Sequence, residues 1–263
     1  MTKLAKEGES TSADAALHKV HDGQIKKEEP AQPPRQRIKN NKYAILLGYQ
    51  GKNYYGMQIQ KDMPTIESHV LDSMYKLGWI TEGMRETPFD FYFQRAARTD
   101  RAVSAVRQII SCQLPRHLDL PIIGPGQIND LLPTDIRVFG IRRTTTSFHA
   151  QKNCDARTYS YTLPTFAFAK ADELTDGSFR IRREVIDEVN AVLAQYVGTH
   201  NFFNYTSKKS FSDRSCNRYI ISFTCGEPFL VEDPVRGGEV EFIACTVKGQ
   251  SFMLHQIRKM IGQ

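Results

Sequence analysis

Residues 89–114, FDFYFQRAARTDRAVSAVRQIISCQL, decide the interpretation of this chain. Arg98-Thr99-Asp100 lies between an aromatic stretch, 89–93, and an apolar stretch, 106–114, and both stretches predict strands. An aspartate between two strands is most often a turn residue that caps the backbone. Asp100 taken alone therefore favours a structural role, and a catalytic role needs support from other parts of the chain.

Strands and helices alternate on both sides of this loop. An apolar run predicts a buried strand at 42–49, and Thr65 is placed as the N-cap of a helix that ends near Gly78. The helix expected at 182–196 has an inner face of Val185, Val189, Val192 and Tyr196. The other expected elements are helices at 127–132 and from about 251 onward, and strands at 136–142, 157–163, 219–225 and 239–247. This alternation predicts an α+β fold.

Composition predicts a soluble intracellular protein. The chain has 263 residues, of which 40% are hydrophobic and 24% charged, which is ordinary for a globular protein. Its apolar runs fall short of the roughly 20 residues that span a bilayer, and no apolar segment follows Met1, so no membrane association is expected. Five scattered cysteines without a C-x-x-C pair predict buried reduced thiols, with no disulfide framework and no zinc site.

Basic residues outnumber acidic ones, and they cluster. The net charge is +6 and the isoelectric point is near 9.0. Such a balance fits either a nucleic-acid partner or simply a basic surface, with equal weight from charge alone. The clusters are Arg142-Arg143, Arg180 with Arg182-Arg183, Lys208-Lys209, Arg214 with Arg218, and Arg258-Lys259.

The first 41 residues are polar and predict a disordered tail, because they cannot bury enough apolar surface to offset the entropy of ordering. A loose basic group stands at the end of this tail. It is either a nuclear import signal or a solvated group, and we expect a nuclear protein, with a mitochondrial form as the alternative. The group consists of Arg35, Arg37, Lys39 and Lys42.

Two later blocks accompany the Arg98-Thr99-Asp100 loop: ARTYSY at 156–161 and GQSFMLHQIRKMIG at 249–262. In this order and at this spacing, the three blocks resemble the TruA family of pseudouridine synthases. The run RTYSYTLPTFAFA at 157–169 is most similar to the eukaryotic branch of that family. Three long blocks in register are a much more specific signal than a single triplet.

The resemblance implies two ferredoxin-like (RRM-like) halves that share one continuous mixed or antiparallel sheet, with the active cleft between them. We expect an N-terminal catalytic half at 42–150, which carries the Asp100 loop, and a C-terminal half at 151–263. Family members continue beyond the helix that carries Arg258. The C-terminal half is therefore expected to lack its last part.

The resemblance also implies a cofactor-independent, metal-independent isomerase that converts uridine to pseudouridine in tRNA and in other RNAs. Asp100 is implied as the catalytic carboxylate, Tyr159 as the pocket residue that stacks on uracil, and Arg258 as the partner of Asp100. Phe252 and Met253 are expected to form pocket walls. The structural alternatives are a core tyrosine, an exposed helix arginine and ordinary core packing.

RNA contacts are expected from five basic residues. Arg98 and Arg101 flank Asp100, and Arg98 would favour the ionised carboxylate. The others are Lys208, Lys209 and Arg214. His149 and His255 are expected either to contact RNA or to make structural hydrogen bonds.

One departure from the family pattern concerns the catalytic loop. The family usually has a glycine where this chain has Ala102, so a positive φ there would strain the backbone. The rival to an active enzyme is therefore a catalytically impaired, truncated RNA-binding isoform. In either case we expect a monomer.

Overall fold

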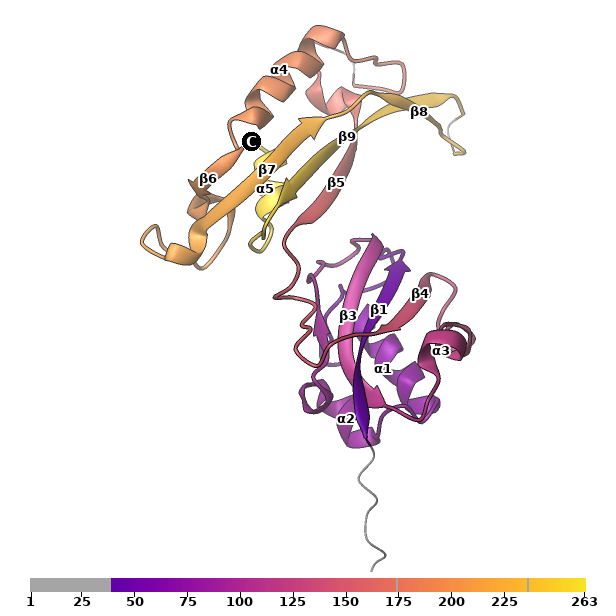
Figure 1. Cartoon of the computed structure of the whole chain (residues 1–263). Coiled ribbons are helices and arrows are strands. Elements are labelled where there is room, and N and C mark those ends of the chain that lie inside the picture. The colour runs from indigo at the N-terminus through magenta and orange to yellow at the C-terminus, as the bar shows by residue number, and fades with distance from the viewer. Residues whose placement is uncertain (1–38, 174, 236) are drawn as a thin grey trace, which may run out of the picture. The chain divides into compact units, whose positions relative to one another are not determined.

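The computed structural model describes residues 39–173, 175–235 and 237–263. In this part of the chain the strands form two antiparallel sheets (Figure 1). Each sheet has a hydrophobic core of its own. The mixed α+β class is thus confirmed. The tail expected at 1–41 lies outside the described residues up to residue 38.

The first sheet has the strand order β2-β3-β1-β4. Its central strand β1 pairs with β3 on one side and with β4 on the other, both antiparallel. The strands expected at 42–49, 106–114 and 136–142 are confirmed to within two residues at either end. The bounds are β1 (Asn40–Tyr49), β2 (Gln94–Arg95), β3 (Ala105–Pro115) and β4 (Ile136–Arg143).

Helix α1 (Ile66–Lys76) begins where the sequence predicts. The Thr65 hydroxyl accepts a hydrogen bond from the backbone amide of Ser68, and the Ser68 hydroxyl accepts one from the backbone amide of Thr65. These two reciprocal bonds form a capping box at the first turn. Gly78, at φ 69°, follows the helix end. A short helix, α2 (Glu82–Glu86), comes next.

Two expectations in the first half are wrong. Residues 89–93 do not form a strand: Pro88 opens the 3₁₀ helix η1 (Pro88–Phe91), since proline suits the first turn of a helix and disrupts a strand ladder. The helix expected at 127–132 is α3 (Leu120–Asn129), which begins seven residues earlier. Its glycines and prolines hid the start, and Gly124 lies close to β4, where an added Cβ would come 2.9 Å from the Ile141 Cδ1.

The second sheet has the order β5-β9-β7-β6, and β8 pairs with the first four residues of β9. Helix α4 (Arg183–Ala194) buries Ile186 and Leu193, whereas Val192, expected on the inner face, is 54% exposed. Val189 and Tyr196 pack against the core as predicted, so only Val192 is misplaced on the inner face. The strands are β5 (Arg157–Pro164), β6 (Gly198–Asn201), β7 (Asn217–Cys225), β8 (Phe229–Glu232) and β9 (Glu239–Gly249), and the 3₁₀ turns are η2 (Thr165–Phe168), η3 (Phe203–Tyr205) and η4 (Arg214–Cys216).

The last helix, α5 (Gln256–Ile261), begins five residues later than expected. His255 stands just before it in the left-handed conformation, at φ 58°. None of the helices in the described part of the chain has the length and apolar character of a membrane span. All five cysteines are free thiols, and all but Cys154 are buried.

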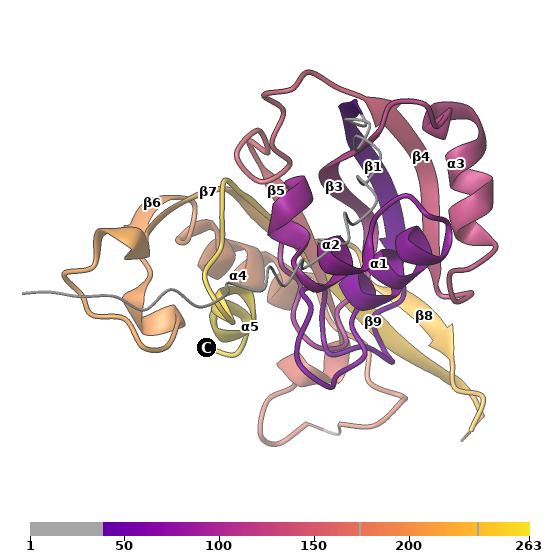
Figure 2. The ribbon, with the colours of Figure 1, turned by 90° about the horizontal axis from the view of Figure 1, so that it is seen from below.

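The expectation of one continuous sheet is wrong, because the described strands form two separate sheets, one of β1 to β4 and one of β5 to β9 (all labelled in Figure 2 except β2). Strand β2 is only two residues long. The next carbonyl along, that of Ala96, accepts hydrogen bonds from the side chain of Arg157, the first residue of β5. The Ala96 carbonyl is therefore bonded to the Arg157 guanidinium and not to a backbone amide of a neighbouring strand.

Candidate active site

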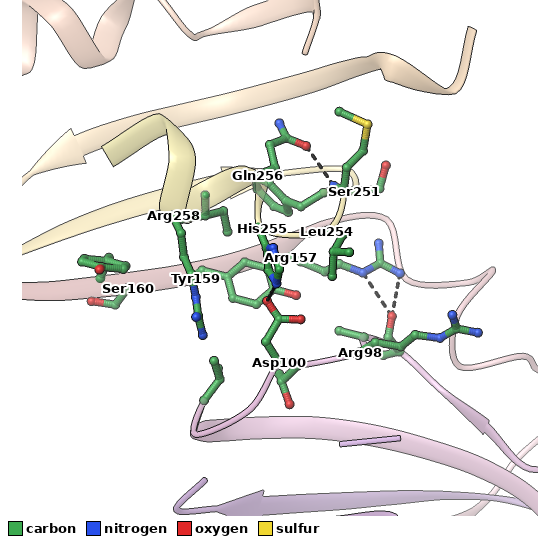
Figure 3. A pocket seen from close by; sticks show the side chains of 18 of the residues that line it. Arg98, Asp100, Arg157, Tyr159, Ser160, Ser251, Leu254, His255, Gln256 and Arg258 are labelled. Atoms are coloured by element: carbon green, nitrogen blue, oxygen red, sulfur yellow. Dashed lines mark hydrogen bonds and ion pairs between the residues drawn. The ribbon is translucent and has the colours of Figure 1, made fainter. Parts of the chain in front are cut away.

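A cavity of about 600 Å³ is lined by three segments far apart in the sequence (Figure 3). One is the Asp100 loop, the second is β5 around Tyr159, and the third is 251–258. Six residues predicted for the site line this cavity together. They are Arg98, Asp100, Tyr159, Phe252, Met253 and Arg258.

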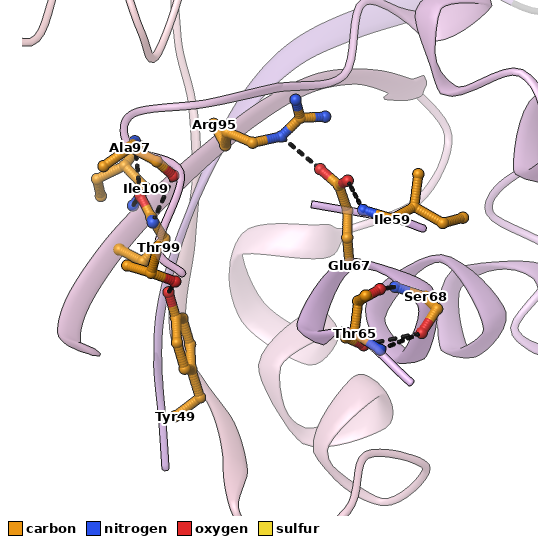
Figure 4. Close-up of polar contacts among 10 residues, drawn as sticks. Tyr49, Ile59, Thr65, Glu67, Ser68, Arg95, Ala97, Thr99 and Ile109 are labelled. Carbon is orange, nitrogen blue, oxygen red and sulfur yellow. Dashed lines mark hydrogen bonds and ion pairs between the residues drawn. The ribbon is translucent and has the colours of Figure 1, made fainter. Parts of the chain in front are cut away.

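The chain leading to Asp100 is anchored at every second residue (Figure 4). Arg95 and Thr99 are held through their side chains and Ala97 through its backbone, so the segment directly before Asp100 is fixed in place. The anchors come from α1, β3 and β1. Arg95 pairs with buried Glu67 at 2.5 Å, the backbone of Ala97 bonds the Gln108 amide group at 2.9 and 3.2 Å, and the Thr99 hydroxyl bonds Tyr49 at 2.8 Å.

Gly56 packs closely against the backbone of the same loop. Its φ is 103°, and a Cβ there would lie 2.7 Å from the carbonyl oxygen of Thr99, so only glycine fits. The Thr99 carbonyl accepts the amide of Met57, and the Ala102 amide donates to Tyr54. Ala102 adopts φ 63°, which confirms the strain expected at this position.

Tyr159 forms the aromatic wall. Its ring meets the ring of Phe252 edge to face, with the centroids 5.3 Å apart. Burial raises the pKa of the Tyr159 hydroxyl above its ordinary value, the Arg157 charge opposes this rise, and the Asp100 carboxylate adds to it. Tyr159 therefore carries its proton at neutral pH and shares one electrostatic environment with Asp100.

The expected partners of Asp100 are not beside it. Arg258 donates to the backbone carbonyl of Arg101 at 3.4 Å, and no ion pair joins it to Asp100 in the described structure. Arg98 is exposed and points away from the carboxylate (Figure 3). His255 lies closest instead, with its Nε2 3.8 Å from Asp100 Oδ2. Because α5 starts at Gln256, His255 lies in the segment just before the helix.

Arg157 holds the segments around the cavity. Its guanidinium makes five hydrogen bonds to four backbone carbonyls, which belong to Ala96, Gln151, Cys154 and Gln250. One of these carbonyls lies before the Asp100 loop and another precedes the segment that carries Phe252. In the sequence Arg157 stands out only as part of a motif, and this role cannot be predicted there because backbone acceptors leave no trace in a sequence.

The remaining predicted RNA contacts lie away from the cavity lining. Arg101 stacks over the ring of Tyr55, 4.6 Å from its centroid. Lys208, Lys209 and Arg214 are exposed in the segment between β6 and β7, and Lys209 pairs with Asp213 at 2.7 Å. Their contact with RNA stays a prediction. Among the residues that the structure describes, no three His, Cys, Asp or Glu side chains are grouped to hold a metal ion.

Comparisons with known proteins bear on the class of this chain. Residues 192–263 match a family described as tRNA pseudouridine synthase. This match covers the last of the three sequence blocks, 249–262, and agrees with the resemblance seen there.

The similarity to individual proteins extends over most of the chain. It is 42% identical to the pseudouridylate synthase 1 homolog of Mus musculus, over 90% of this chain and 55% of that protein. The homolog of the same name from Homo sapiens is 43% identical, over 83% of this chain and 50% of that protein. The tRNA pseudouridine synthase 1 of Yarrowia lipolytica is 30% identical, over 92% and 58%. The chain spans about half the length of these relatives.

Proposed function

We propose that this chain is an RNA uridine isomerase that forms pseudouridine in tRNA. The observation that carries the proposal is the cavity in which Asp100, Tyr159 and Phe252 meet. Asp100 is the one carboxylate among the described residues that line it. The names of the similar proteins support the same activity.

The reaction breaks the N1–C1′ bond of uridine, turns the uracil and joins C5 to C1′. It is an isomerisation, so every atom and electron stays within the nucleotide. It needs a carboxylate that attacks the nucleotide or removes a sugar proton, which we assign to Asp100. We assign two roles to Tyr159. Its ring holds the detached base by stacking, and its hydroxyl takes part in the transfer of the proton at C5.

The target nucleotide has to leave its stack to reach the cavity. Basic side chains around the opening would hold the displaced backbone, as phosphate contacts position a nucleic acid without reading its sequence. Arg98 and Arg258 line the cavity, and Arg101 follows Asp100. We extend the RNA surface to Lys208, Lys209 and Arg214, with tRNA as the main partner and other RNAs as further substrates.

The strand order of the first sheet supports a finer assignment of the fold. Elements β1-α1-β2-β3-α3-β4 with the order β2-β3-β1-β4 match a ferredoxin-like unit, and we infer that class for the first half. For the second half the same class stays a prediction. The nuclear location and the monomeric state also stay predictions.

RNA binding without turnover is the second candidate, and two observations favour it. Ala102 stands at φ 63° where a glycine would be unstrained. Arg258 binds the Arg101 carbonyl instead of the Asp100 carboxylate. Both changes affect catalysis while leaving basic side chains free to bind RNA.

One assay separates the two candidates. Unmodified tRNA is incubated with the protein, and pseudouridine is measured by nucleoside mass spectrometry beside tRNA affinity. We expect turnover by the wild type, none by Asp100→Asn, and full turnover by Asp90→Asn, which removes an exposed carboxylate in η1. Tight binding without product in the wild type would select the second candidate. Equal product from Asp100→Asn would refute the role of the carboxylate.

A further inference from the structure

A second cavity, of about 280 Å³, lies beside β1 in the first half of the chain. None of the residues that line it also lines the Asp100 cavity. We name it the Lys42 pocket. Its lining residues are Lys42, Tyr92, Gln94, Gln113, Thr146, Ser147, Phe148 and His149.

Lys42 is a buried cation without a carboxylate partner. It is 4% exposed and lies near the start of β1, opposite Gln113 of β3, which removes it from the basic group that we considered as an import signal. Its ammonium donates to the Tyr92 carbonyl at 2.9 Å and to Gln94 Oε1 at 2.8 Å. An ammonium has three donors, so one remains, and no described residue accepts it.

The backbone is shaped around this ammonium. Tyr92 adopts the left-handed conformation, φ 55°, which is uncommon for an aromatic residue and turns its carbonyl to Lys42. The Tyr92 ring also lies under the ammonium, 5.8 Å from its nitrogen. Burial lowers the pKa of Lys42, so an additional acceptor would stabilise the charged form.

Two other polar groups of the pocket, Gln94 and His149, have an acceptor occupied and donors left over. Gln94 Oε1 also accepts from Ser111, which leaves both amide hydrogens of Gln94. His149 Nδ1 accepts the amides of Gln151 and Lys152, so the proton of the neutral ring sits on Nε2. Among the described residues, none of those lining the pocket carries a carboxylate. Such a set suits a ligand that offers only acceptors.

We propose that the Lys42 pocket binds a phosphate group. Phosphate offers several acceptor oxygens and a negative charge, which match the remaining donors and the uncompensated ammonium. The group can come from a free phosphate compound or from the backbone of a bound RNA. The proposal does not depend on the function assigned to the Asp100 cavity, and its failure would leave that function untouched.

The test uses inorganic phosphate and the His149 ring as a reporter. The His149 proton and nitrogen resonances are followed by NMR while phosphate is added to the full chain at constant ionic strength. We expect a saturable shift in the wild type and at least about tenfold weaker binding in Lys42→Met, since a charged donor is lost. Absence of a saturable shift in the wild type, or an equal response to acetate, would overturn the proposal.

The matched control is Lys152→Met. Burial, Lys152 and Lys42 all lower the pKa of His149, so both variants remove a positive charge near the reporter. Only Lys42 lines the pocket, and Lys152→Met should bind phosphate nearly as the wild type does. Equal losses in the two variants would contradict a specific site.

A second variant covers the case in which Lys42→Met fails to fold. His149→Phe keeps Lys42 and removes one remaining donor, and its binding is read from the ³¹P line width of phosphate. We expect severalfold weaker binding, and unchanged binding would count against the pocket. The source is then identified with tRNA: an RNA phosphate predicts weaker tRNA binding by Lys42→Met than by Lys152→Met, and a free phosphate compound predicts equal binding.

Discussion

Arg157 donates to the carbonyl oxygen of Ala96 from two nitrogens, Nε at 3.1 Å and Nη2 at 2.7 Å. The first residue of β5 thereby holds the backbone four residues ahead of Asp100. The same guanidinium bonds the carbonyl of Gln250, two residues ahead of Phe252, at 2.5 Å. One side chain therefore sets the spacing between the carboxylate and the aromatic wall.

Replacement of Arg157 by lysine should lower the free energy of unfolding by about 3 kcal/mol, because a single ammonium cannot reach all of these carbonyls. Urea denaturation followed by circular dichroism measures the loss. Arg180→Lys is the control, since Arg180 also bonds two carbonyls, but both lie in its own turn. Similar losses of unfolding free energy in the two variants would show that the hydrogen bonds of Arg157 stabilise the protein no more than bonds within one turn do.

The Tyr159→Phe variant tests the tyrosine hydroxyl. Phenylalanine keeps the edge-to-face contact with Phe252, so tRNA affinity should stay near that of the wild type. The single-turnover rate should fall about 100-fold if the hydroxyl serves a proton transfer. Tyr219→Phe, on an exposed position of β7, controls for the loss of a hydroxyl. An unchanged rate in Tyr159→Phe would limit Tyr159 to packing.

Ala102→Gly should stabilise the protein by about 1 kcal/mol, because glycine tolerates a positive φ without strain. Ala105→Gly in β3 is the matched control and should lose about 0.5–1 kcal/mol through chain entropy. Thermal melts of both variants check the opposite signs. A loss in both variants would mean that Ala102 is not strained in solution.

The buried ion pair of Glu67 predicts a pH effect on stability. Burial raises the pKa of Glu67 above 4.5, although Arg95 opposes the rise. The native state therefore holds the proton more tightly than the unfolded chain does, and the Glu67 contribution to stability falls as pH rises above 4.5. Unfolding free energies at a series of pH values should fall less steeply for Glu67→Gln, which still accepts the Ile59 amide. Parallel profiles would contradict the raised pKa.

Exposed lysines between β6 and β7 should add to RNA affinity without reading sequence. Lys208→Ala should weaken tRNA binding more than Lys209→Ala, because Lys209 is already paired with Asp213. Each lost phosphate contact should also reduce the slope of log affinity against log salt by about one. Filter binding on two different tRNAs checks both expectations, and a loss confined to one tRNA would indicate base recognition.

The main strands were predictable because their apolar residues follow a simple pattern. β1, β3, β7 and β9 all appear at their expected places, and Thr65 caps α1 as its sequence suggests. Two of the misplaced elements contain proline or glycine. Pro88 turns an aromatic stretch into η1, and the prolines and glycines of α3 hid its start.

The site was predictable where a motif carries it and unpredictable where it depends on long-range contacts. Asp100, Tyr159 and Phe252 meet as expected. The neighbour of Asp100 is His255 and not Arg258 because of the position at which α5 starts. At that start, buried Gln256 accepts the amide of Met253 at 2.9 Å, a contact without a pattern in the sequence.

The two hydrophobic cores each supply one wall of the cavity. Asp100 is fixed through Glu67, Gln108 and Tyr49 to the first core, whereas Tyr159 and Phe252 pack on the second. The second core gathers fewer buried residues from the described chain. Because the cavity needs both walls, we expect it to be lost on warming as soon as either core opens. A sample can keep much of its secondary structure after the cavity has been lost.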